Sequence, residues 1–306
     1  MADQLGNLVR LARPRHWVKS SFVLIPLVFA KRFLDGRAWL EAGVAFAAFS
    51  LAASAAYVFN DIRDRESDRL HPVKRARPLA SGSVSVAAAS MEAVVLLPAS
   101  LVLALAVNLP LAVVILTYFG LQVAYSLYLR DRILLDVICI AMGFVLRALA
   151  GAVSIRVEIS PWLLICTFAL CLFMGFCKRY NELATFGEPE AASQHRPLFG
   201  EYTTDLLSHL VTLSAGIAIV AFLLYATAGR TVGQFGTPYL AYTLPFVVYG
   251  VGRFAMLSMR GTYADPTDLI LRDRPFQATI VLWGAAAVAV ILYGPQLHKL
   301  LSELLP

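Results

Sequence analysis

The sequence predicts an all-α, polytopic membrane protein with about nine transmembrane helices, because the chain is apolar, poor in charge and divided into long hydrophobic stretches. Of its 306 residues, 59% are hydrophobic and 15% are charged, whereas a soluble globular domain carries roughly 25% charged residues. The mean hydropathy is +0.70. Apolar stretches of roughly 20 residues are long enough to cross a bilayer as helices. Polar loops connect these stretches, so the membrane bilayer is the expected environment of the chain.

The elements follow in order from the hydropathy pattern. Residues 2–16 form a short interfacial helix whose basic residues lie near lipid headgroups. The nine expected spans are residues 18–33, 38–59, 86–107, 110–129, 134–154, 161–178, 206–228, 238–258 and 276–294. We expect them to form a single transmembrane helical domain over residues 1–306, with polar loops at residues 60–85, 179–205 and 259–275.

The distribution of basic residues predicts the orientation of the chain. When the expected spans are counted in order, most of the 26 Lys and Arg residues fall on one side of the membrane. By the positive-inside rule this side is the cytoplasm, and all three long polar loops lie on it. We therefore expect a multi-pass protein of the cell inner (plasma) membrane with an active site that faces the cytoplasm. We find no nucleic-acid motif, and the small residues in the spans permit a homo-oligomer.

The most informative polar segment is the acidic stripe, which consists of Asn60, Asp61, Asp64 and Asp68 at the end of the second expected span. On a helix with about 100° per residue, these side chains share an arc of about 100°. Crowded carboxylates repel each other unless a cation lies among them, and hard oxygen ligands suit Mg²⁺, usually together with substrate phosphates. The stripe therefore predicts a Mg²⁺ site; a solvated acidic helix end is the alternative.

A basic loop follows the acidic stripe directly and contains Lys74, Arg75 and Arg77. Such side chains can clamp phosphate oxygens, and the alternative is that they only supply positive charge on the cytoplasmic side. Because the metal ligands and the basic side chains are neighbours in the sequence, we favour phosphate binding.

A second candidate segment, Lys178-Arg179-Tyr180-Asn181-Glu182, ends the sixth expected span. Lys178 and Glu182 are four residues apart and so share a helix face. The segment is either a functional site or a basic anchor at a helix end, and the residues alone leave both readings open.

Two further groups of charged residues are candidates. Asp136 and Arg147 are eleven residues apart in the fifth expected span, so they share a helix face at a separation of roughly 16 Å. An unpaired charge near mid-membrane is costly, so Arg147 is expected to line a polar cavity, and a structural pair is the alternative. Asp268, Arg272 and Asp273, before the last span, either close over a polar ligand or belong to a solvated loop.

The motif Asn60-Asp61-x-x-Asp64-x-x-x-Asp68 on a frame of nine spans resembles the UbiA superfamily of intramembrane prenyltransferases. In that superfamily the motif binds Mg²⁺ and a diphosphate, and a second Asp-rich motif usually follows the sixth span. Here the matching segment, residues 178–182, is basic instead. This departure resembles the decaprenyl-phosphate phosphoribosyltransferase branch, as do the runs Arg13-Pro14-Arg15-His16-Trp17-Val18-Lys19 and Leu271-Arg272-Asp273-Arg274.

The resemblance implies an enzyme that transfers 5-phosphoribose from phosphoribosyl pyrophosphate to a polyprenyl phosphate and releases pyrophosphate. It implies that Mg²⁺ at the acidic stripe holds the pyrophosphate, with Asp61 and Asp64 as catalytic ligands. Lys74, Arg77 and the catalytic Lys178 then neutralise the charge that develops as the C1–O bond breaks. Further substrate contacts are expected from Lys19, Asp68, Arg75, Asp136, Arg147, Arg179, Tyr180, Glu182, Asp268 and Arg272.

Two other functions use the same residues. An ordinary prenyltransferase moves the chain of a prenyl diphosphate to an aromatic acceptor such as 4-hydroxybenzoate, with the same Mg²⁺–diphosphate chemistry; the basic second segment argues against it. A carrier of lipid phosphates has a use for the basic loops but little need for three carboxylates on one helix face.

Overall fold

The computed structural model describes residues 2–71, 73–158, 160–186, 201–263 and 266–304, and every regular element in these ranges is helical. The all-α prediction is therefore confirmed for the described chain. Contacts group the chain into two compact units. The first unit comprises Met1–Arg130 and Met142–Ile159, and the second comprises Asp131–Ala141 and Ser160–Pro306.

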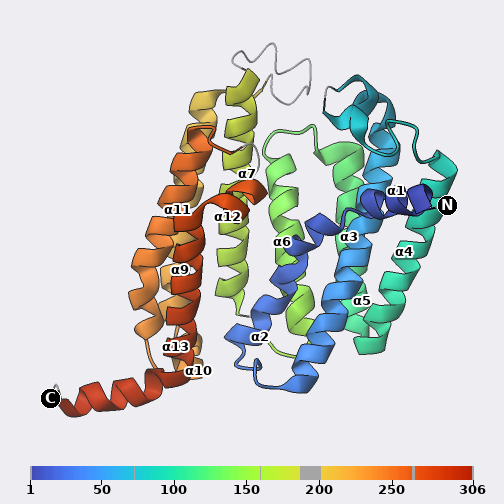
Figure 1. Cartoon of the computed structure of the whole chain (residues 1–306). Coiled ribbons are helices and arrows are strands. Elements are labelled where there is room, and N and C mark those ends of the chain that lie inside the picture. The colour runs from blue at the N-terminus through green and yellow to red at the C-terminus, as the bar shows by residue number, and fades with distance from the viewer. Residues whose placement is uncertain (1, 72, 159, 187–200, 264–265, 305–306) are drawn as a thin grey trace. The chain divides into compact units, whose positions relative to one another are not determined.

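The first unit is built around one long helix, α3, beside which α4 and α5 pack (Figure 1). Its elements are α1 (Ala2–Ala12), the 3₁₀ helix η1 (Pro14–Leu24), α2 (Ile25–Phe29), α3 (Gly36–Leu70), the 3₁₀ turn η2 (Lys74–Ala76), α4 (Val86–Val107), α5 (Leu109–Ala124), the π-helical turn η3 (Tyr125–Leu129) and the second part of α6 (Leu135–Ser154).

Side-chain caps fix where these helices begin. The Asp35 carboxylate accepts hydrogen bonds from the backbone N–H groups of Arg37 and Ala38 at the start of α3. Ser85 and Asn108 cap α4 and α5 in the same way. Each cap satisfies N–H groups that the first turn of a helix leaves without a partner.

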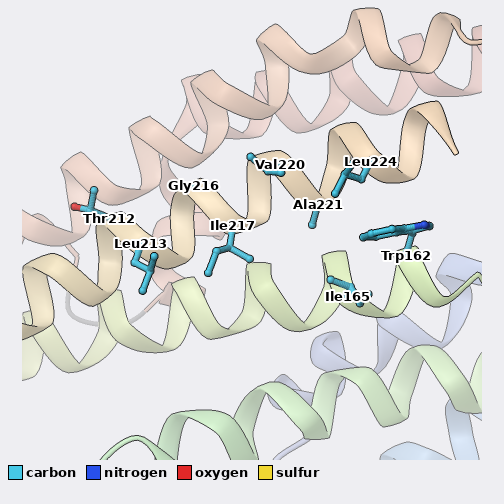
Figure 2. Close-up of a pocket in the computed structure, with 9 residues that line it drawn as sticks. All are labelled: Trp162, Ile165, Thr212, Leu213, Gly216, Ile217, Val220, Ala221 and Leu224. Atoms are coloured by element: carbon cyan, nitrogen blue, oxygen red, sulfur yellow. The ribbon is translucent and has the colours of Figure 1, made fainter.

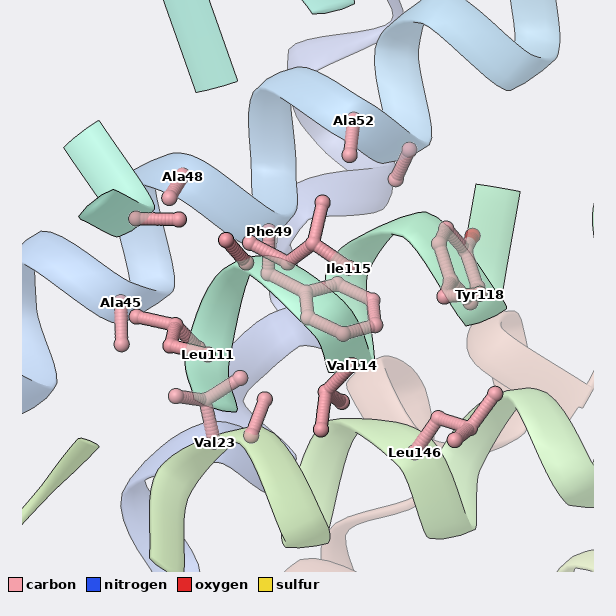
Figure 3. Packing of buried hydrophobic residues seen from close by; sticks show 14 residues of the cluster. Val23, Ala45, Ala48, Phe49, Ala52, Leu111, Val114, Ile115, Tyr118 and Leu146 are labelled. Carbon is pink, nitrogen blue, oxygen red and sulfur yellow. The ribbon is translucent and has the colours of Figure 1, made fainter. Parts of the chain in front are cut away.

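The core of the first unit alternates small and large side chains. Figure 3 shows Ala45, Ala48 and Ala52 of α3 around Phe49, which lies beside Ile115 of α5. The alanines let the neighbouring helices approach α3, and the hydroxyl group of Ser100 in α4 donates to the backbone carbonyl oxygen of Ala48 at 2.6 Å. This close packing fixes the position of α3, which carries the acidic stripe near its C-terminal end.

The second unit packs α7 against α9 and α11 against α13 (Figure 1). Its elements are the first part of α6, α7 (Pro161–Phe186), α9 (Thr204–Thr227), α10 (Gly229–Phe235), the 3₁₀ turn η5 (Tyr239–Thr243), α11 (Leu244–Met259), α12 (Pro266–Arg272) and α13 (Arg274–Leu304). Phe173, Phe254 and Phe276 meet in its core at ring-centroid distances of 5.6 and 5.8 Å. The core joins α7, α11 and α13.

Eight helices in the described residues are long and apolar enough to cross a membrane. They are Gly36–Leu70, Val86–Val107, Leu109–Leu129, Leu135–Ser154, Pro161–Ala184, Thr204–Thr227, Tyr239–Met259 and Arg274–Lys299. They match eight of the nine expected spans. The protein is therefore a multi-pass membrane protein.

The remaining expected span, residues 18–33, differs from the prediction. This stretch is η1 followed by the five-residue helix α2. Pro14 and Pro26 have no N–H to donate, and the N–H of Ile25 bonds to the Phe22 carbonyl oxygen three residues before it, which is 3₁₀ geometry. The hydropathy of the stretch is that of a span, but Pro26 within it and Pro14 before it interrupt the α-helical hydrogen-bond series.

Candidate active site

The acidic stripe lies on the last turns of α3, which continues without a break to Leu70. The helical placement of the stripe is therefore confirmed. Asp61 and Asp68 are 2% and 3% exposed, so the stripe is not a solvated helix end. A buried carboxylate needs a charged or hydrogen-bonding partner.

Arginines supply these partners within the first unit. Arg13 donates from Nη2 to Asp61 Oδ1 at 2.5 Å. Arg77 Nη1 bridges Asp61 Oδ1 at 3.1 Å and Asp68 Oδ2 at 2.6 Å. Arg130 Nη1 binds both oxygens of Asp64, with the distance to Oδ2 at 2.6 Å. Each carboxylate of the stripe therefore forms an ion pair with at least one arginine.

Three different backbone features bring these arginines to the stripe. Arg13 joins α1 to η1 in the left-handed conformation, with φ of 52°. Arg77 precedes Pro78, which favours an extended backbone in the residue before it, and Arg77 has φ of −65° and ψ of 146°. Arg130 directly follows the π-helical turn η3. Only Arg77 was predicted as a site residue, and no sequence pattern signals the contacts of Arg13 or Arg130.

A hydrogen-bond chain links η3 to the stripe. The Ser126 hydroxyl in η3 donates to Asn60 Oδ1 at 3.1 Å, and Asn60 Nδ2 donates to Asp64 Oδ2 at 3.2 Å. This chain fixes the amide of Asn60 between α3 and η3.

The other predicted phosphate-binding residues of the first unit lie near these elements. Lys74 and Arg75 are exposed on η2, just before Arg77. Lys19 is half-buried in η1. The segment that carries Lys19 is fastened to α3, because Trp17 Nε1 donates to the Ser54 hydroxyl group at 3.0 Å.

Arg147 lies on α6 with Asp136, as predicted, but its side chain is 5% exposed and enclosed by aromatic rings. Its guanidinium carbon lies 5.1, 4.9 and 5.1 Å from the ring centroids of Phe49, Tyr118 and Phe144. It donates to the Tyr118 hydroxyl oxygen at 3.0 Å and to the Gly143 carbonyl oxygen at 2.8 Å. Ring faces attract a cation, so these contacts hold the charge within the apolar core.

In the second unit, Asp136 and Arg179 form a buried ion pair, with Nε and Oδ2 2.6 Å apart. Arg179 also binds Glu182 one turn later on α7. Lys178 Nζ lies 3.9 Å from the other oxygen of Glu182, and these two side chains are only partly buried. Arg179 thus connects a buried carboxylate to a more accessible one.

Tyr202 completes this cluster and was not predicted. Its hydroxyl donates to Asp136 Oδ1 at 3.2 Å and accepts from the backbone N–H of Leu134 at 2.9 Å. Burial, together with the charge of Asp136, raises the pKa of Tyr202 to about 12, so it remains a hydrogen-bond donor at neutral pH. Tyr202 is separated from Asp136 by 66 residues, and sequence spacing gives no indication of the contact.

The remaining predicted residues make contacts within the second unit. Tyr180 packs against its core, and Asn181 Nδ2 donates to the Tyr263 carbonyl oxygen at 2.7 Å. Asp268 and Arg272 pair with each other on α12, with Nε and Oδ1 3.7 Å apart.

Asp273, a candidate from the sequence, forms an ion pair with Arg253, which was not predicted. Arg253 of α11 holds both oxygens of Asp273 at 2.6 and 2.9 Å, and Asp273 also accepts from the backbone N–H of Phe276 at 2.8 Å. The hydrogen bond from Arg253 lowers the pKa of Asp273 below its usual value.

The acidic stripe fits a Mg²⁺ ion by the chemistry of its donors, because carboxylate and amide oxygens are the ligands that this ion prefers. Within the described chain, however, no three His, Cys, Asp or Glu side chains converge as a metal-binding group. Arg77 stands between Asp61 and Asp68, and Arg13 and Arg130 occupy further carboxylate oxygens. The metal assignment therefore stays a prediction that requires these arginines to move.

An apolar groove lies between α7 and α9 in the second unit, where Trp162 and Ile165 face Leu213, Ile217 and Leu224 (Figure 2). Its volume is about 530 Å³. No titratable side chain lines it, so it offers surface for hydrocarbon rather than reactive groups.

The chain is similar to known proteins over nearly its whole length. The family model described as the UbiA prenyltransferase family matches residues 23–271. Decaprenyl-phosphate phosphoribosyltransferase of Mycobacterium tuberculosis strain H37Rv is 34% identical over 297 residues, which cover 96% of this chain and 97% of that protein. The Corynebacterium glutamicum protein of the same name is 31% identical, with 94% of this chain and 88% of that protein covered.

The fold is also found among solved structures. A UbiA homolog from Archaeoglobus fulgidus bound to GPP and Mg²⁺ superposes with a TM-score of 0.65 at 20% identity, covering 93% of this chain and 99% of that one. At this identity the likeness concerns the fold alone. Together with the family match and the full-length relatives, it shows that the chain belongs to the UbiA prenyltransferase family of membrane-embedded transferases.

Proposed function

We propose that this protein transfers 5-phosphoribose from phosphoribosyl pyrophosphate to a polyprenyl phosphate and releases pyrophosphate in a Mg²⁺-dependent reaction. The observation that carries the proposal is the acidic stripe with its arginines, a concentration of oxygen ligands and cations suited to a metal-bound diphosphate. The names of the relatives that match nearly the whole chain support this choice of substrates.

Mg²⁺ would be held by Asn60, Asp61, Asp64 and Asp68. When bound, it supplies positive charge that stabilises a departing pyrophosphate. Asp61 and Asp64 are the principal ligands in this proposal, because they stand one turn apart on the same face of α3.

Basic side chains of the first unit bind the phosphates of the donor. Arg77 presents a planar guanidinium that matches phosphate oxygens in pairs. Lys74 and Arg75 extend from the exposed turn beside it, and Lys19 is positioned by η1. These cations orient the leaving group and neutralise its charge as the bond to ribose C1 breaks.

The residues of the second unit divide into two roles. Lys178, Tyr180 and Glu182 are proposed to contact substrate, with Lys178 as the cation that stabilises developing negative charge. The buried Asp136–Arg179 pair positions Glu182. Asp268 and Arg272 on α12 remain proposed substrate contacts, and so does Arg147 of the first unit.

The acceptor phosphate needs little help from a general base, because it is already anionic at neutral pH. Its isoprenoid tail stays in the hydrocarbon of the bilayer. We further propose that the active site opens to the cytoplasmic side of the inner membrane, since a soluble sugar donor must reach the acidic stripe from water.

A transfer assay tests the proposal. Purified protein receives labelled phosphoribosyl pyrophosphate, a polyprenyl phosphate and Mg²⁺, and labelled lipid is measured after extraction. Label in the lipid fraction is expected only when all three are present. Absence of labelled lipid, together with turnover of a prenyl diphosphate and 4-hydroxybenzoate, would establish prenyl transfer instead. If neither reaction proceeds, a carrier of lipid phosphates is favoured.

A further inference from the structure

The arginines of the acidic stripe occupy several of the carboxylate oxygens that a metal ion could use. Asp64 has both oxygens bound by Arg130, and Asp61 Oδ1 accepts from Arg13 and Arg77 together. An oxygen that accepts two guanidinium hydrogen bonds has its lone-pair directions occupied, and the guanidinium charges repel a cation. Binding of a metal through these oxygens therefore requires Arg130 to release Asp64, and Arg13 and Arg77 to release Asp61 Oδ1.

In each of these ion pairs the arginine side chain is more exposed than the aspartate side chain. The side chains of Arg13 and Arg130 are 20% and 25% exposed, while those of Asp61 and Asp64 are 2% and 13% exposed. A guanidinium on a long, partly solvated side chain can turn away from its carboxylate, whereas a carboxylate on the packed end of α3 cannot follow it. Movement at the stripe is thus expected from the arginines.

Both arginines also depend on unusual backbone. Arg13 holds a left-handed conformation without being glycine, which is rare and costly. Arg130 follows a π-helical turn, a rare element that is frequent at functional sites. The left-handed residue Arg13 also ends α1, since a helix often ends at a residue in this conformation. Both features place a guanidinium against the stripe.

We infer that Arg13 and Arg130 are phosphate-binding residues that exchange partners during substrate binding. Each neutralises a carboxylate of the stripe until a divalent cation takes that carboxylate, and then binds phosphate oxygens of the donor. The inference rests on the proposed function for the identity of the donor. It adds two residues to the site and makes metal binding and phosphate binding favour each other.

The exchange of partners predicts that substitution of either arginine changes the affinities for the divalent cation and for pyrophosphate in opposite directions. Removing either guanidinium removes a competitor for a carboxylate, so a divalent cation should bind more tightly. The same substitution removes a phosphate ligand, so pyrophosphate should bind more weakly. An arginine that only holds its aspartate in the geometry for metal binding would weaken both.

The test measures Mn²⁺ binding by electron paramagnetic resonance on the full chain in detergent, without donor or acceptor. Arg13→Gln and Arg130→Gln are compared with Arg63→Gln, which removes the same charge from an exposed side chain whose guanidinium donates to the Leu127 carbonyl oxygen. We expect the first two variants to bind Mn²⁺ about threefold more tightly than Arg63→Gln, a change in the range of one ion pair.

A second measurement titrates inorganic pyrophosphate in saturating Mg²⁺ by calorimetry. We expect about a tenfold loss of affinity in Arg13→Gln and Arg130→Gln, because a charge-assisted hydrogen bond is lost, and little change in Arg63→Gln. Circular dichroism and gel filtration show whether each variant folds. If a glutamine variant does not fold, Arg13→Lys and Arg130→Lys replace it. The pyrophosphate affinities of the lysine variants should lie between those of wild type and the glutamine variants.

If Arg13→Gln and Arg130→Gln bind Mn²⁺ no more tightly than Arg63→Gln does, the proposed exchange of partners is overturned. Tighter Mn²⁺ binding with unchanged pyrophosphate affinity overturns the assignment of these arginines to phosphate. Neither the Mn²⁺ affinity nor the pyrophosphate affinity depends on the transfer reaction. A failure of the proposed function is therefore seen in a different experiment, as the absence of labelled lipid with the wild-type protein.

Discussion

At the scale of single residues, the acidic stripe is a set of ion pairs. Asp61 and Asp68 are almost fully buried, and the bridge from Arg77 offsets the repulsion between them. The cations around the stripe, rather than the carboxylates alone, make it suited to a diphosphate.

Substitution of Asp64 by Asn should abolish most of the activity. It removes one proposed metal ligand and the partner of Arg130 while keeping the shape of the side chain. We expect the rate of phosphoribosyl transfer to fall by about 100-fold or more, measured at limiting Mg²⁺. Glu66→Gln is the matched control, because Glu66 is an exposed acid on the same helix that pairs with Arg69. Intact activity of Asp64→Asn at limiting Mg²⁺ would show that the metal assignment is wrong.

The Arg253–Asp273 pair should make stability depend on acid pH. The folded-state pKa of Asp273 lies below its usual value of 3.8, so ionised Asp273 stabilises the fold above about pH 4 and loses this effect as the pH falls through the lowered pKa. Asp273→Asn keeps an oxygen for the Phe276 N–H but removes the charge. We expect its melting temperature to lie below that of wild type at pH 7, and the gap to narrow below about pH 4.

Asp205→Asn serves as the control for this series, because Asp205 is an exposed acid at the start of α9. Its difference from wild type should be small throughout the pH range. A gap for Asp273→Asn that widens as the pH falls would contradict the assigned sign.

At the scale of elements, α6 and η1 approach each other so closely that one position allows only glycine. A Cβ atom on Gly151 would lie 1.9 Å from the backbone carbonyl oxygen of Val23. Since that oxygen belongs to the main chain of η1, no side chain can rotate out of the way. This contact fixes η1, and with it the segment that carries Arg13 and Lys19.

Substitution of Gly151 by Ala should therefore separate η1 from α6. We expect the free energy of unfolding to fall by about 1–3 kcal/mol, measured by thermal or denaturant unfolding in detergent. Gly120→Ala is the control, because open space surrounds that position in α5 and alanine favours a helix by up to about 1 kcal/mol. Equal stability of the two variants would show that η1 yields at little cost.

At the scale of the whole molecule, the length of α3 decides on which sides of the membrane its two ends lie. The 35 residues of α3 extend about 52 Å, well beyond a hydrocarbon core of about 30 Å. Its two ends therefore lie on opposite sides. The loop after the acidic stripe is expected on the cytoplasmic side.

Accessibility of introduced cysteines tests this orientation. Ser81→Cys lies beyond the stripe and Leu34→Cys lies before α3, and both positions are exposed. A membrane-impermeant maleimide should label Ser81→Cys in inside-out vesicles and Leu34→Cys in right-side-out vesicles. The unsubstituted chain, in which Cys139, Cys171 and Cys177 are buried, gives the background. The reverse labelling pattern would overturn the cytoplasmic assignment.

The sequence could predict the helical class, eight of the spans and the helical face shared by the acidic stripe, because these depend on hydropathy and on a period of 3.6 residues. It could not predict that residues 18–33 form η1 and α2, since hydropathy is insensitive to the hydrogen bonds that Pro26 removes. It also missed Arg13, Arg130 and Tyr202. Each meets its partner across 48 residues or more, and only the folded chain brings them together.

The length of α3 has a consequence for the kinetics of the enzyme. The apolar part of the helix spans the hydrocarbon core, so the acidic stripe lies at the depth of the lipid headgroups. A polyprenyl phosphate, the proposed acceptor, keeps its own phosphate at that depth and approaches by diffusion in two dimensions. The relevant concentration of the acceptor is then its mole fraction in the bilayer, and adding inert lipid slows the reaction as dilution of a soluble substrate would.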